Sequence, residues 1–428
     1  MKDTKDIIAC VIDHGLFLPM AQKLSEQYQQ VYYFSPWEKS FPTLRDGAVG
    51  DGFKNIKRVD SPWSVMKECD LAIFPDIGFA DMQAHIADDL RIPVWGARKA
   101  DTLESNRGKF LKAIEGLGMP VPHYEAIKGI ANLRSHLRDK EDKFIKISKW
   151  RGEAETFHWR DWAHDEATLD FMAHKLGPWR RHLTFYVLDP IDTDIEGGMD
   201  TYCIDGKIPD KCINGFEAKD KAYLCTVTDR EGVPEGIRHV TEEFVKLLVP
   251  YGYRSLLSTE IRVSGNDNYF IDLTARAGSP PSQCQSELFG NLGDIIWMGA
   301  NGECIEPKET AKFGVQALII WKGDKSCWRE VSIPEEIFQW VKVPNACLLD
   351  GMVCQPPDED GAFGWLVSTG DTIKETIDTL KEYAGELPDG LSVDLSALGD
   401  LLGEAHKAEE EGMEFTSQEV PEPESVIQ

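Results

Sequence analysis

The sequence predicts a multidomain α/β protein whose first domain is built on a parallel sheet. Two observations indicate this fold class. Short apolar segments of strand length alternate with helical segments over the first hundred residues, which is the pattern of a parallel sheet wound with helices. The chain has 428 residues, more than one ordinary core accommodates, so about two to four domains are expected.

The N-terminal elements are placed by their apolar runs. We expect helices at residues 19–27 and 79–90, and strands at residues 7–13, 31–34, 70–75 and 93–96. The turn that follows the first strand reads Asp13-His14-Gly15-Leu16 and lacks the Gly-x-Gly-x-x-Gly fingerprint. A dinucleotide site in this domain is therefore not expected.

Further elements are expected in the middle and C-terminal parts of the chain. A helix is predicted over residues 106–117, because Gly118 and Pro120 are typical of a helix C-terminus. The tail from residue 404 is acidic and contains a Pro-Glu-Pro-Glu stretch, so we expect disorder beyond Gly412. The other predicted elements are strands at 144–147, 185–188 and 269–273 and a helix at 372–383.

Charge and composition exclude several classes of function. The formal net charge of −27 argues against a nucleic-acid-binding surface, because a polyanion would be repelled. Apolar runs stay well short of the roughly 20 residues that a membrane helix needs. The charged N-terminus is not typical of a signal peptide. The ten cysteines are scattered, with Cys347 and Cys354 the closest pair, which favours reduced thiols in a cytoplasm.

Two carboxylates that flank a predicted turn are candidate metal ligands. Glu260 and Asp272 lie on either side of Gly265-Asn266-Asp267-Asn268, and residues that flank a hairpin face each other. Alternation along the strand then places Asp272, Thr274 and Arg276 on one face. A carboxylate, a hydroxyl and a guanidinium on one face suit a magnesium–phosphate centre. A solvated strand face with a surface salt bridge explains the same residues equally well.

Lys146 is a candidate phosphate ligand. It ends the apolar strand that contains Phe144 and Ile145, and a loop with Gly152 follows. A lysine in such a position binds phosphates as a point charge, and the loop supplies backbone donors. Taken alone, an ordinary lysine that extends along the surface is the more frequent explanation.

The order of these features resembles that of the ATP-grasp ligases. Residues 101–122 resemble the lysine-bearing helix that leads to Gly-x-Pro in this superfamily, and Lys143-Phe-Ile-Lys146 resembles its phosphate-binding strand. Residues 187–196 resemble its adenine-binding hinge, and Glu260 with residues 270–276 resembles its metal-binding pair. Within the superfamily, residues 275–282 and 365–373 are most similar to phosphoribosylamine–glycine ligase-like proteins.

The resemblance implies a domain organisation. Residues 1–105 would form a Rossmann-like α/β domain that precedes the ATP-grasp fold, and residues 106–310 would form the ATP-grasp domain, with two α+β lobes and a hinge near 187–196. Residues 311–403 would form a small C-terminal α+β domain, and residues 404–428 would form the acidic tail.

The resemblance also implies an activity and its ligands. ATP-grasp ligases transfer the γ-phosphoryl group of ATP to a carboxylate and join the resulting acyl phosphate to an amine, which forms a C–N bond. The expected cofactors are ATP and Mg²⁺, with Mn²⁺ as an alternative metal. The expected partners are a small-molecule carboxylate and a small-molecule amine, and a homodimer is compatible with this class.

The implied site residues fall into three groups. The catalytic residues are Lys146 and Arg276. The metal ligands are Glu260, Asp272 and Thr274. Glu217 is a weaker candidate that lies near the phosphates together with Lys219. Nucleotide contacts are implied for Arg107, Lys146, Asp189, Pro190, Ile191, Glu196 and Lys219.

The sequence departs from the family pattern in several places. Arg107 stands where lysine is usual, Asp272 where glutamate is usual, and Thr274 where asparagine is usual. The glycine-rich loops that hold phosphoribosylamine are missing, so phosphoribosylamine and glycine are not the expected substrates. The substitutions leave open a catalytically altered nucleotide-binding module with a regulatory or interaction role. A nucleotide-dependent oxidoreductase is a third, less favoured class.

Overall fold

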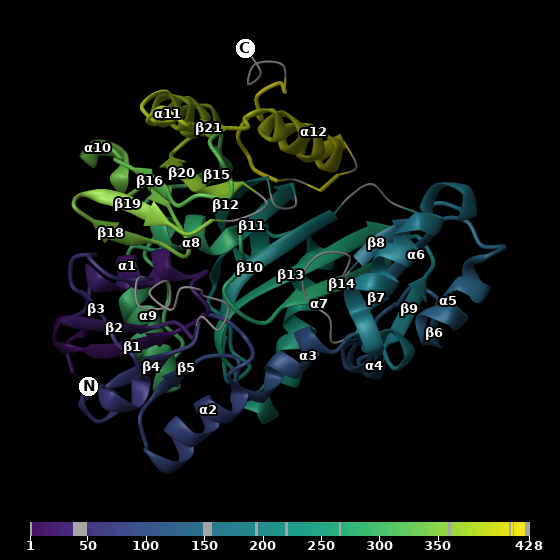
Figure 1. Ribbon diagram of the computed structural model, residues 1–428, viewed down its shortest axis with the longest axis horizontal. Helices are drawn as coiled ribbons and strands as arrows, with labels where there is room; N and C mark the ends of the chain where they lie inside the picture. The colour runs from purple at the N-terminus through teal and green to yellow at the C-terminus, as the bar shows by residue number, and fades with distance from the viewer. Residues whose placement is uncertain are drawn as a thin grey trace. The chain divides into compact units, whose positions relative to one another are not determined.

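The computed structural model describes residues 2–36, 49–148, 156–192, 196–218, 221–264, 267–357, 361–410, 412–413 and 415–423. The chain divides into two compact units. Unit 1 comprises residues 1–99, 197–259 and 274–428, and unit 2 comprises residues 100–196 and 260–273. Figure 1 labels the helices and strands of both units.

Unit 1 begins with the parallel sheet that the sequence predicts. The strands pair in parallel in the order β3-β2-β1-β4-β5. Ala9, Cys10 and Val11 of the central strand are fully buried, as expected for a parallel strand that is covered on both faces. The elements are β1 (Ile8–Ile12), α1 (Leu18–Ser25), β2 (Gln30–Phe34), β3 (Ile56–Arg58), β4 (Leu71–Ile73), α2 (Ala80–Ala84) and β5 (Val94–Trp95).

Asp13 follows β1 and fixes the loop that leads to α1. Its fully buried carboxylate accepts hydrogen bonds from the backbone N–H groups of Gly15 (2.9 Å) and Phe17 (2.6 Å) and from the hydroxyl of Tyr33 (2.5 Å). Burial raises the pKa of Asp13 to about 6, although these hydrogen bonds lower it. The loop conformation therefore depends on one buried carboxyl group.

We expect the substitution Asp13→Asn to change how stability depends on pH. Because the folded-state pKa of about 6 lies above the ordinary value of 3.8, the protonated carboxyl contributes stability that is present below about pH 4 and lost as the pH rises to about 6. Since a pKa difference of one corresponds to about 1.4 kcal/mol, the wild type should lose about 3 kcal/mol relative to the variant across this range. Urea unfolding at pH 4 and pH 7 measures the difference in unfolding free energy between the wild type and the variant. An equal difference at the two pH values would contradict the raised pKa of Asp13.

An antiparallel sheet forms the larger part of unit 1. Within this unit the strands pair in the order β13-β10-β11-β12-β15-β20-β17, and β21 pairs with β15. A separate small sheet has the order β16-β19-β18. The strands are β10 (Glu196–Ile204), β11 (Lys211–Ala218), β12 (Ala222–Asp229), β13 (Arg254–Ser264), β15 (Phe313–Trp321), β16 (Arg329–Val331), β17 (Val341–Lys342), β18 (Cys347–Leu349), β19 (Met352–Gln355), β20 (Ala362–Gly370) and β21 (Leu391–Val393).

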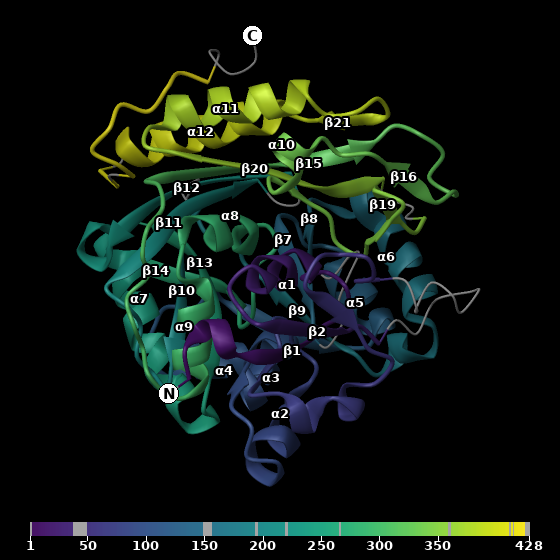
Figure 2. The same ribbon diagram turned by 90° about the vertical axis from the view of Figure 1, so that its left-hand side faces the viewer.

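Helices cover both faces of this antiparallel sheet. Helix α11 packs against β15 and β20, and α12 packs against β11 and β12. Helix α8 contacts β15 and β20 from the opposite face (Figure 2). The helices of this part are α7 (Glu235–Val245), α8 (Pro281–Leu288), α9 (Leu292–Ala300), α10 (Glu335–Phe338), α11 (Ile373–Gly385) and α12 (Ser396–Glu410).

The C-terminal region differs from its prediction in two ways. The antiparallel sheet continues across the domain boundary that was expected between residues 310 and 311, because β15 pairs with β12. Helix α12 includes the first residues of the expected tail. The predicted disorder beyond Gly412 is wrong for Phe415 and Val420, which are buried. Phe415 packs on Phe216 of β11 with ring centroids 5.0 Å apart. The contact of Phe415 with Phe216 attaches the acidic segment to β11.

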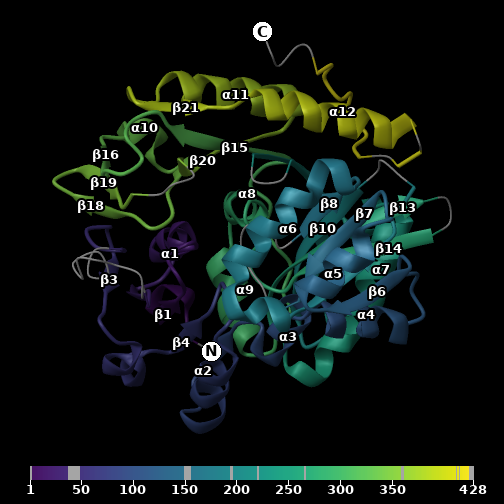
Figure 3. The ribbon, with the colours of Figure 1, turned by 45° about the vertical axis from the view of Figure 1, so that its right-hand side comes forward.

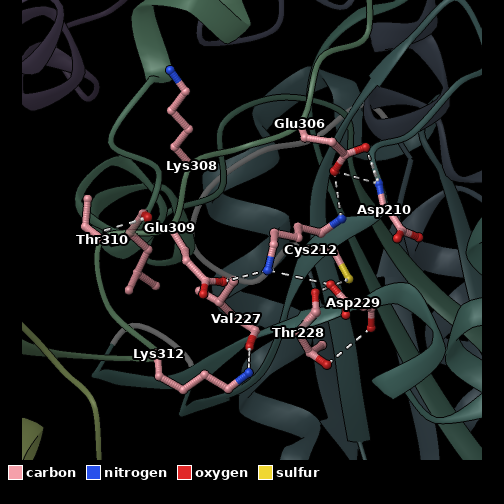
Figure 4. A network of polar contacts seen from close by, with 12 residues as sticks. Asp210, Cys212, Val227, Thr228, Asp229, Glu306, Lys308, Glu309, Thr310 and Lys312 are labelled. Atoms are coloured by element: carbon pink, nitrogen blue, oxygen red, sulfur yellow. Dashed lines mark hydrogen bonds and ion pairs between the residues drawn. The ribbon is translucent and has the colours of Figure 1, made fainter.

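A polar network attaches the segment before β15 to the edge of β11 and β12 (Figure 4). The carboxylate of Glu306 accepts hydrogen bonds from the backbone N–H groups of Asp210 (2.9 Å) and Lys211 (3.1 Å). The Lys211 ammonium lies 2.8 Å from the Glu309 carboxylate. Lys312 donates to the carbonyl oxygen of Val227. The network fixes the chain that connects α9 to β15.

Unit 2 contains a four-stranded antiparallel sheet with the order β6-β9-β7-β8. Helices α5 and α6 cover one face (Figure 3), where Leu133, Ile145, Trp159, Leu169 and Phe185 form a fully buried core. The second half of β13 and most of β14 also belong to this unit. The elements are α3 (Asp101–Ser105), α4 (Arg107–Gly116), β6 (Tyr124–Lys128), α5 (Ile130–Leu137), β7 (Lys143–Ile147), β8 (Thr156–Trp159), α6 (Trp162–Leu176), β9 (Thr184–Leu188) and β14 (Asp267–Thr274).

All ten cysteines are free thiols, eight of them buried. Across the described ranges, no helix has the length and apolar character needed to span a bilayer.

Candidate functional site

Asp272 is the centre of an ion-pair cluster within unit 2. It lies near the end of β14, and its Oδ1 atom is 2.9 Å from Nη2 of Arg107. Its Oδ2 atom is 3.2 Å from Nζ of Lys146. Both cations also donate to the carbonyl oxygen of Ile271, at 2.8 Å and 3.4 Å. Two cations share one carboxylate, so the three side chains together carry an excess positive charge.

Arg107 is positioned by the start of α4. The preceding residue, Asn106, caps the helix by accepting the N–H of Lys109 through its side chain at 3.3 Å. The Arg107 guanidinium packs over the ring of Phe110 at 5.2 Å, and its side chain is only 9% exposed. The first turn of α4 therefore positions the buried guanidinium of Arg107.

Lys146 is positioned by the alternation of β7. Ile145 and Ile147 point into the core of unit 2, which places Lys146 on the other face of the strand. Burial lowers the pKa of the Lys146 ammonium, and Arg107 lowers it further, whereas Asp272 and Glu260 raise it. The net shift is downward, so this lysine holds its proton less tightly than an exposed lysine.

Glu260 and Glu196 form a pair of carboxyl groups near Lys146. The Glu260 side chain remains accessible to solvent, yet the surrounding protein atoms raise the pKa of its carboxyl group well above the ordinary value. A hydrogen bond shared with Glu196 and the charges of Glu196 and Asp272 raise this pKa further. Arg262 donates to Glu196 at 2.7 Å, and the pKa of Glu196 is lowered, despite its burial, by Glu260, Arg262 and Lys146. Within this pair, Glu260 therefore binds a proton more tightly than an isolated glutamate does.

These carboxylates fit a hard divalent cation. A hydrogen bond between two carboxyl groups requires a proton, and a divalent cation can replace that proton. All the donors are oxygens, as Mg²⁺ prefers. Among the residues that the structure describes, no group of three or more His, Cys, Asp or Glu side chains could hold a metal. Magnesium does not need such a group, because it is usually bound through one or two carboxylates together with substrate phosphates.

The predicted hinge residues follow β9. The backbone N–H of Asp189 donates to the carbonyl oxygen of His123 at 2.9 Å, and its carboxylate is 3.0 Å from Lys143. Pro190 is exposed, and Ile191 is partly buried. Residues 193–195 lie outside the described residues. Nucleotide contacts at Asp189, Pro190 and Ile191 remain predictions.

Three of the four remaining predicted residues lie among the described residues, and all three belong to unit 1. Thr274 and Arg276 belong to unit 1, where Arg276 lies 3.6 Å from Asp76 and donates to the carbonyl oxygen of Ala277 at 2.9 Å. Lys219 lies outside the described residues, and Glu217 is exposed at the end of β11. The roles of Arg276, Thr274, Glu217 and Lys219 remain predictions.

Arg262 is a residue of the cluster that the sequence analysis missed. It lies two positions after Glu260 on β13 and contacts Glu196 and the ring of Phe144. The period of two along a strand places Glu260 and Arg262 on the same face, so alternation alone could have found it. Glu196, predicted as a nucleotide ligand, interacts with Arg262 and Glu260 in this structure.

Comparison with known proteins adds evidence on the fold. No family model matches the sequence, and no curated protein sequence matches it. Solved structures match over most of the chain. Phosphoribosylamine–glycine ligase from Thermotoga maritima is 13% identical, with a TM-score of 0.68 over 90% of this chain and 99% of that enzyme.

Two other solved structures, of enzymes named for different activities, are also similar to this chain. L-amino acid ligase from Bacillus licheniformis is 15% identical, with a TM-score of 0.58 over 91% of this chain and 99% of the other. The biotin carboxylase domain of Hydrogenobacter thermophilus 2-oxoglutarate carboxylase, a dimer solved with MgADP and bicarbonate, is 11% identical, with a TM-score of 0.62 over 95% and 96%. The chain therefore has the ATP-grasp fold, which confirms the predicted fold class.

Proposed function

We propose that the protein is an ATP-dependent carboxylate–amine ligase that acts through an acyl phosphate. The observation that carries the proposal is the arrangement of Arg107 and Lys146 around Asp272, with the carboxyl group of Glu260 nearby. Phosphates and a divalent cation would together replace the internal ion pairs and the shared proton. The ATP-grasp fold supports the same function, because solved proteins with this fold include ligases.

Arg107 and Lys146 are proposed to bind the phosphates of ATP. Both side chains are shielded from solvent, where a charge contact is worth more than in water. Glu260 and Asp272 would hold Mg²⁺, or Mn²⁺ in its place. When bound, the metal supplies positive charge that offsets the charge of the transferring phosphoryl group. Asp272 would then exchange part of its interaction with the two cations for the metal.

The chemistry requires no nucleophile from the protein. A substrate carboxylate attacks the γ-phosphorus and displaces ADP, and an amine then attacks the acyl carbon and displaces phosphate. The proposed contribution of this chain is positioning and charge neutralisation, which supply most of the catalysis in phosphoryl transfer.

Phosphoribosylamine and glycine are not proposed as the substrates. The first turn of the N-terminal domain reads His14-Gly15-Leu16-Phe17, without the glycine-rich run that lets backbone amides approach a sugar phosphate. The backbone N–H groups of Gly15 and Phe17 are already bonded to Asp13. The free cysteines support a proposed location in the cytoplasm.

A regulatory nucleotide-binding module is the second candidate. The favouring observation is that Asp272 pairs with both proposed phosphate ligands, which could hold the site in an inactive arrangement. This candidate predicts nucleotide binding without turnover.

An ADP-release assay tests the proposal. Purified protein is incubated with ATP, magnesium and pools that combine small carboxylic acids, the standard amino acids and small amines. We expect at least one pool to raise ADP formation above the ATP-only rate. Lys128, an exposed lysine in the same sheet as Lys146, provides a matched control variant, Lys128→Gln, that should keep this activity. A folded wild type that binds ATP but responds to no pool would favour the regulatory module.

A further inference from the structure

A second cluster of chemically capable side chains lies in unit 1, where the order of the parallel sheet reverses. The chain proceeds from β1 outward through β2 to β3, and then returns to β4 and β5 on the other side of β1. In open sheets of this kind, ligands bind beyond the carboxyl ends of the strands at the reversal point. The segments that follow β1 and β4 at this point are residues 13–17 and 74–79.

His14, in the first segment, is held by two groups from the second. Its ring stacks on Phe79, with centroids 4.6 Å apart and an interplanar angle of 24°. Its Nδ1 atom is 3.4 Å from Oδ2 of Asp76. The His14 side chain is 51% exposed and that of Asp76 is 16% exposed. The imidazole therefore reaches solvent while its carboxylate partner is shielded.

Asp76 is fixed in place and ionised. It accepts the backbone N–H of Ile77 at 2.8 Å, and Nε of Arg276 is 3.6 Å from its Oδ1 atom. Burial raises the pKa of Asp76, but the hydrogen bond with His14 and the charge of Arg276 outweigh burial, so this pKa lies below its ordinary value. An ionised carboxylate only accepts hydrogen bonds, so Nδ1 of His14 donates. In the neutral form of the ring, the lone pair is then on Nε2.

Several segments converge on this pair. The backbone N–H of Ala277 donates to the carbonyl oxygen of Pro75 at 2.9 Å, which attaches the segment after β14 to the loop after β4. The Arg276 guanidinium packs over the ring of Phe17 at 5.9 Å. A surface His–Asp pair with no further role would account for the hydrogen bond alone. It would not account for the stacked ring, the shielded carboxylate and their position at the reversal point.

We propose that His14 is the general base that deprotonates the amine substrate, with Asp76 as its positioning residue. This inference rests on the proposed ligase function. The amine arrives as an ammonium ion, and Nε2 of His14 removes one proton. The nitrogen lone pair then forms the C–N bond to the acyl carbon, and the C–O bond to phosphate breaks. Phosphate leaves with that electron pair and takes up the second proton released by the nitrogen, which gives the amide and inorganic phosphate.

Replacing the amine substrate by hydroxylamine distinguishes a loss of amine deprotonation from a loss of carboxylate activation. Hydroxylamine is largely unprotonated at neutral pH, so it captures an acyl phosphate without a base, whereas an ammonium ion must first lose a proton. The carboxylate donors used are the standard amino acids, which also serve as amines. We expect His14→Gln to retain hydroxamate formation within about twofold and to lose amide formation by about 100-fold or more, within the range of general-base catalysis.

Matched variants complete the assay. His85→Gln is the control, because His85 is also 51% exposed and its Nδ1 atom also contacts a carboxylate, that of Asp89 at 2.6 Å. This control should leave both products unchanged. Asp76→Asn should lower amide formation selectively. Equal loss of both products in His14→Gln, or unchanged amide formation, would overturn the inference. Absence of both products from the wild type would instead overturn the ligase function on which it rests.

The tautomer of His14 provides a test that needs no substrate. Long-range proton–nitrogen NMR of protein with ¹⁵N-labelled histidine distinguishes the two neutral tautomers, and His14→Gln identifies the signal. Because burial raises the pKa of Asp13 to about 6, and Asp76 and Arg276 add charges nearby, a pH profile would combine several groups, whereas the tautomer reports on His14 alone. We expect the Nδ1–H form in the wild type and a smaller share of it in Asp76→Asn. A dominant Nε2–H form in the wild type would overturn the inference.

Discussion

The variant Lys146→Gln is expected to fold normally and to lose turnover by about 100- to 1,000-fold, or roughly 2.7–4 kcal/mol of transition-state stabilisation. The reason is that Lys146 is a shielded point charge, and its proposed phosphate partners gain charge as the reaction proceeds. In the free protein its partners are Asp272 and a backbone carbonyl, and Arg107 continues to hold both when the ammonium is removed. The melting temperature should therefore change much less than the rate.

The measurement compares ADP formation, ATP affinity and melting temperature in the wild type, Lys146→Gln and Lys128→Gln. Lys128 is an exposed lysine on β6 of the same sheet, so its substitution controls for the loss of one positive charge. Equal ATP affinity and turnover in all three proteins would remove Lys146 from the site. A large fall in melting temperature for Lys146→Gln alone would indicate a structural role instead.

The variant Asp272→Asn is expected to need much more magnesium for activity. Removing one carboxylate charge weakens a proposed direct metal ligand while nearly preserving its shape. The magnesium concentration at half-maximal activity should rise by at least the roughly 10- to 100-fold that loss of an outer-shell partner costs. The same substitution releases Arg107 and Lys146 from their shared carboxylate, so ATP binding without magnesium should be kept or strengthened.

Magnesium titrations of Asp272→Asn, Glu260→Gln and Asp267→Asn provide the comparison. Glu260→Gln should behave like Asp272→Asn, because the two carboxylates are proposed to hold the same ion. Asp267 is exposed at the start of β14 and serves as the control on the same strand. Titrations of the first two variants that overlay the wild type would contradict the metal assignment.

Local sequence signals predicted the parts of the fold that depend on local chemistry. The buried strand β1 and helix α4 lie within two residues of their predicted bounds, because apolar runs, an asparagine cap and Gly118 specify them. Strand β3 was missed, since Ile56–Arg58 has only one apolar residue. The burial of Phe415 was missed because its partner, Phe216, is almost two hundred positions away in the sequence.

In the candidate site, too, the sequence predicted individual residues but not the contacts between distant parts of the chain. Lys146, Glu260 and Asp272 were identified from strand ends and a hairpin, and the structure brings them into one electrostatic group. The ion pair between Arg107 and Asp272 could not be predicted, because these residues are 165 positions apart and meet only through tertiary structure. The His14–Asp76 pair depends in the same way on the neighbouring positions of β1 and β4.

Transfer of oxygen-18 tests the central claim most directly. The carboxylic acids of a pool that stimulates ADP release are labelled in both carboxylate oxygens, and the inorganic phosphate produced is analysed by mass spectrometry. An acyl phosphate passes one oxygen of the carboxylate to the phosphate when the amine displaces it. The ligase mechanism therefore predicts one ¹⁸O atom in each phosphate molecule formed. Unlabelled phosphate during continued ADP formation would contradict it.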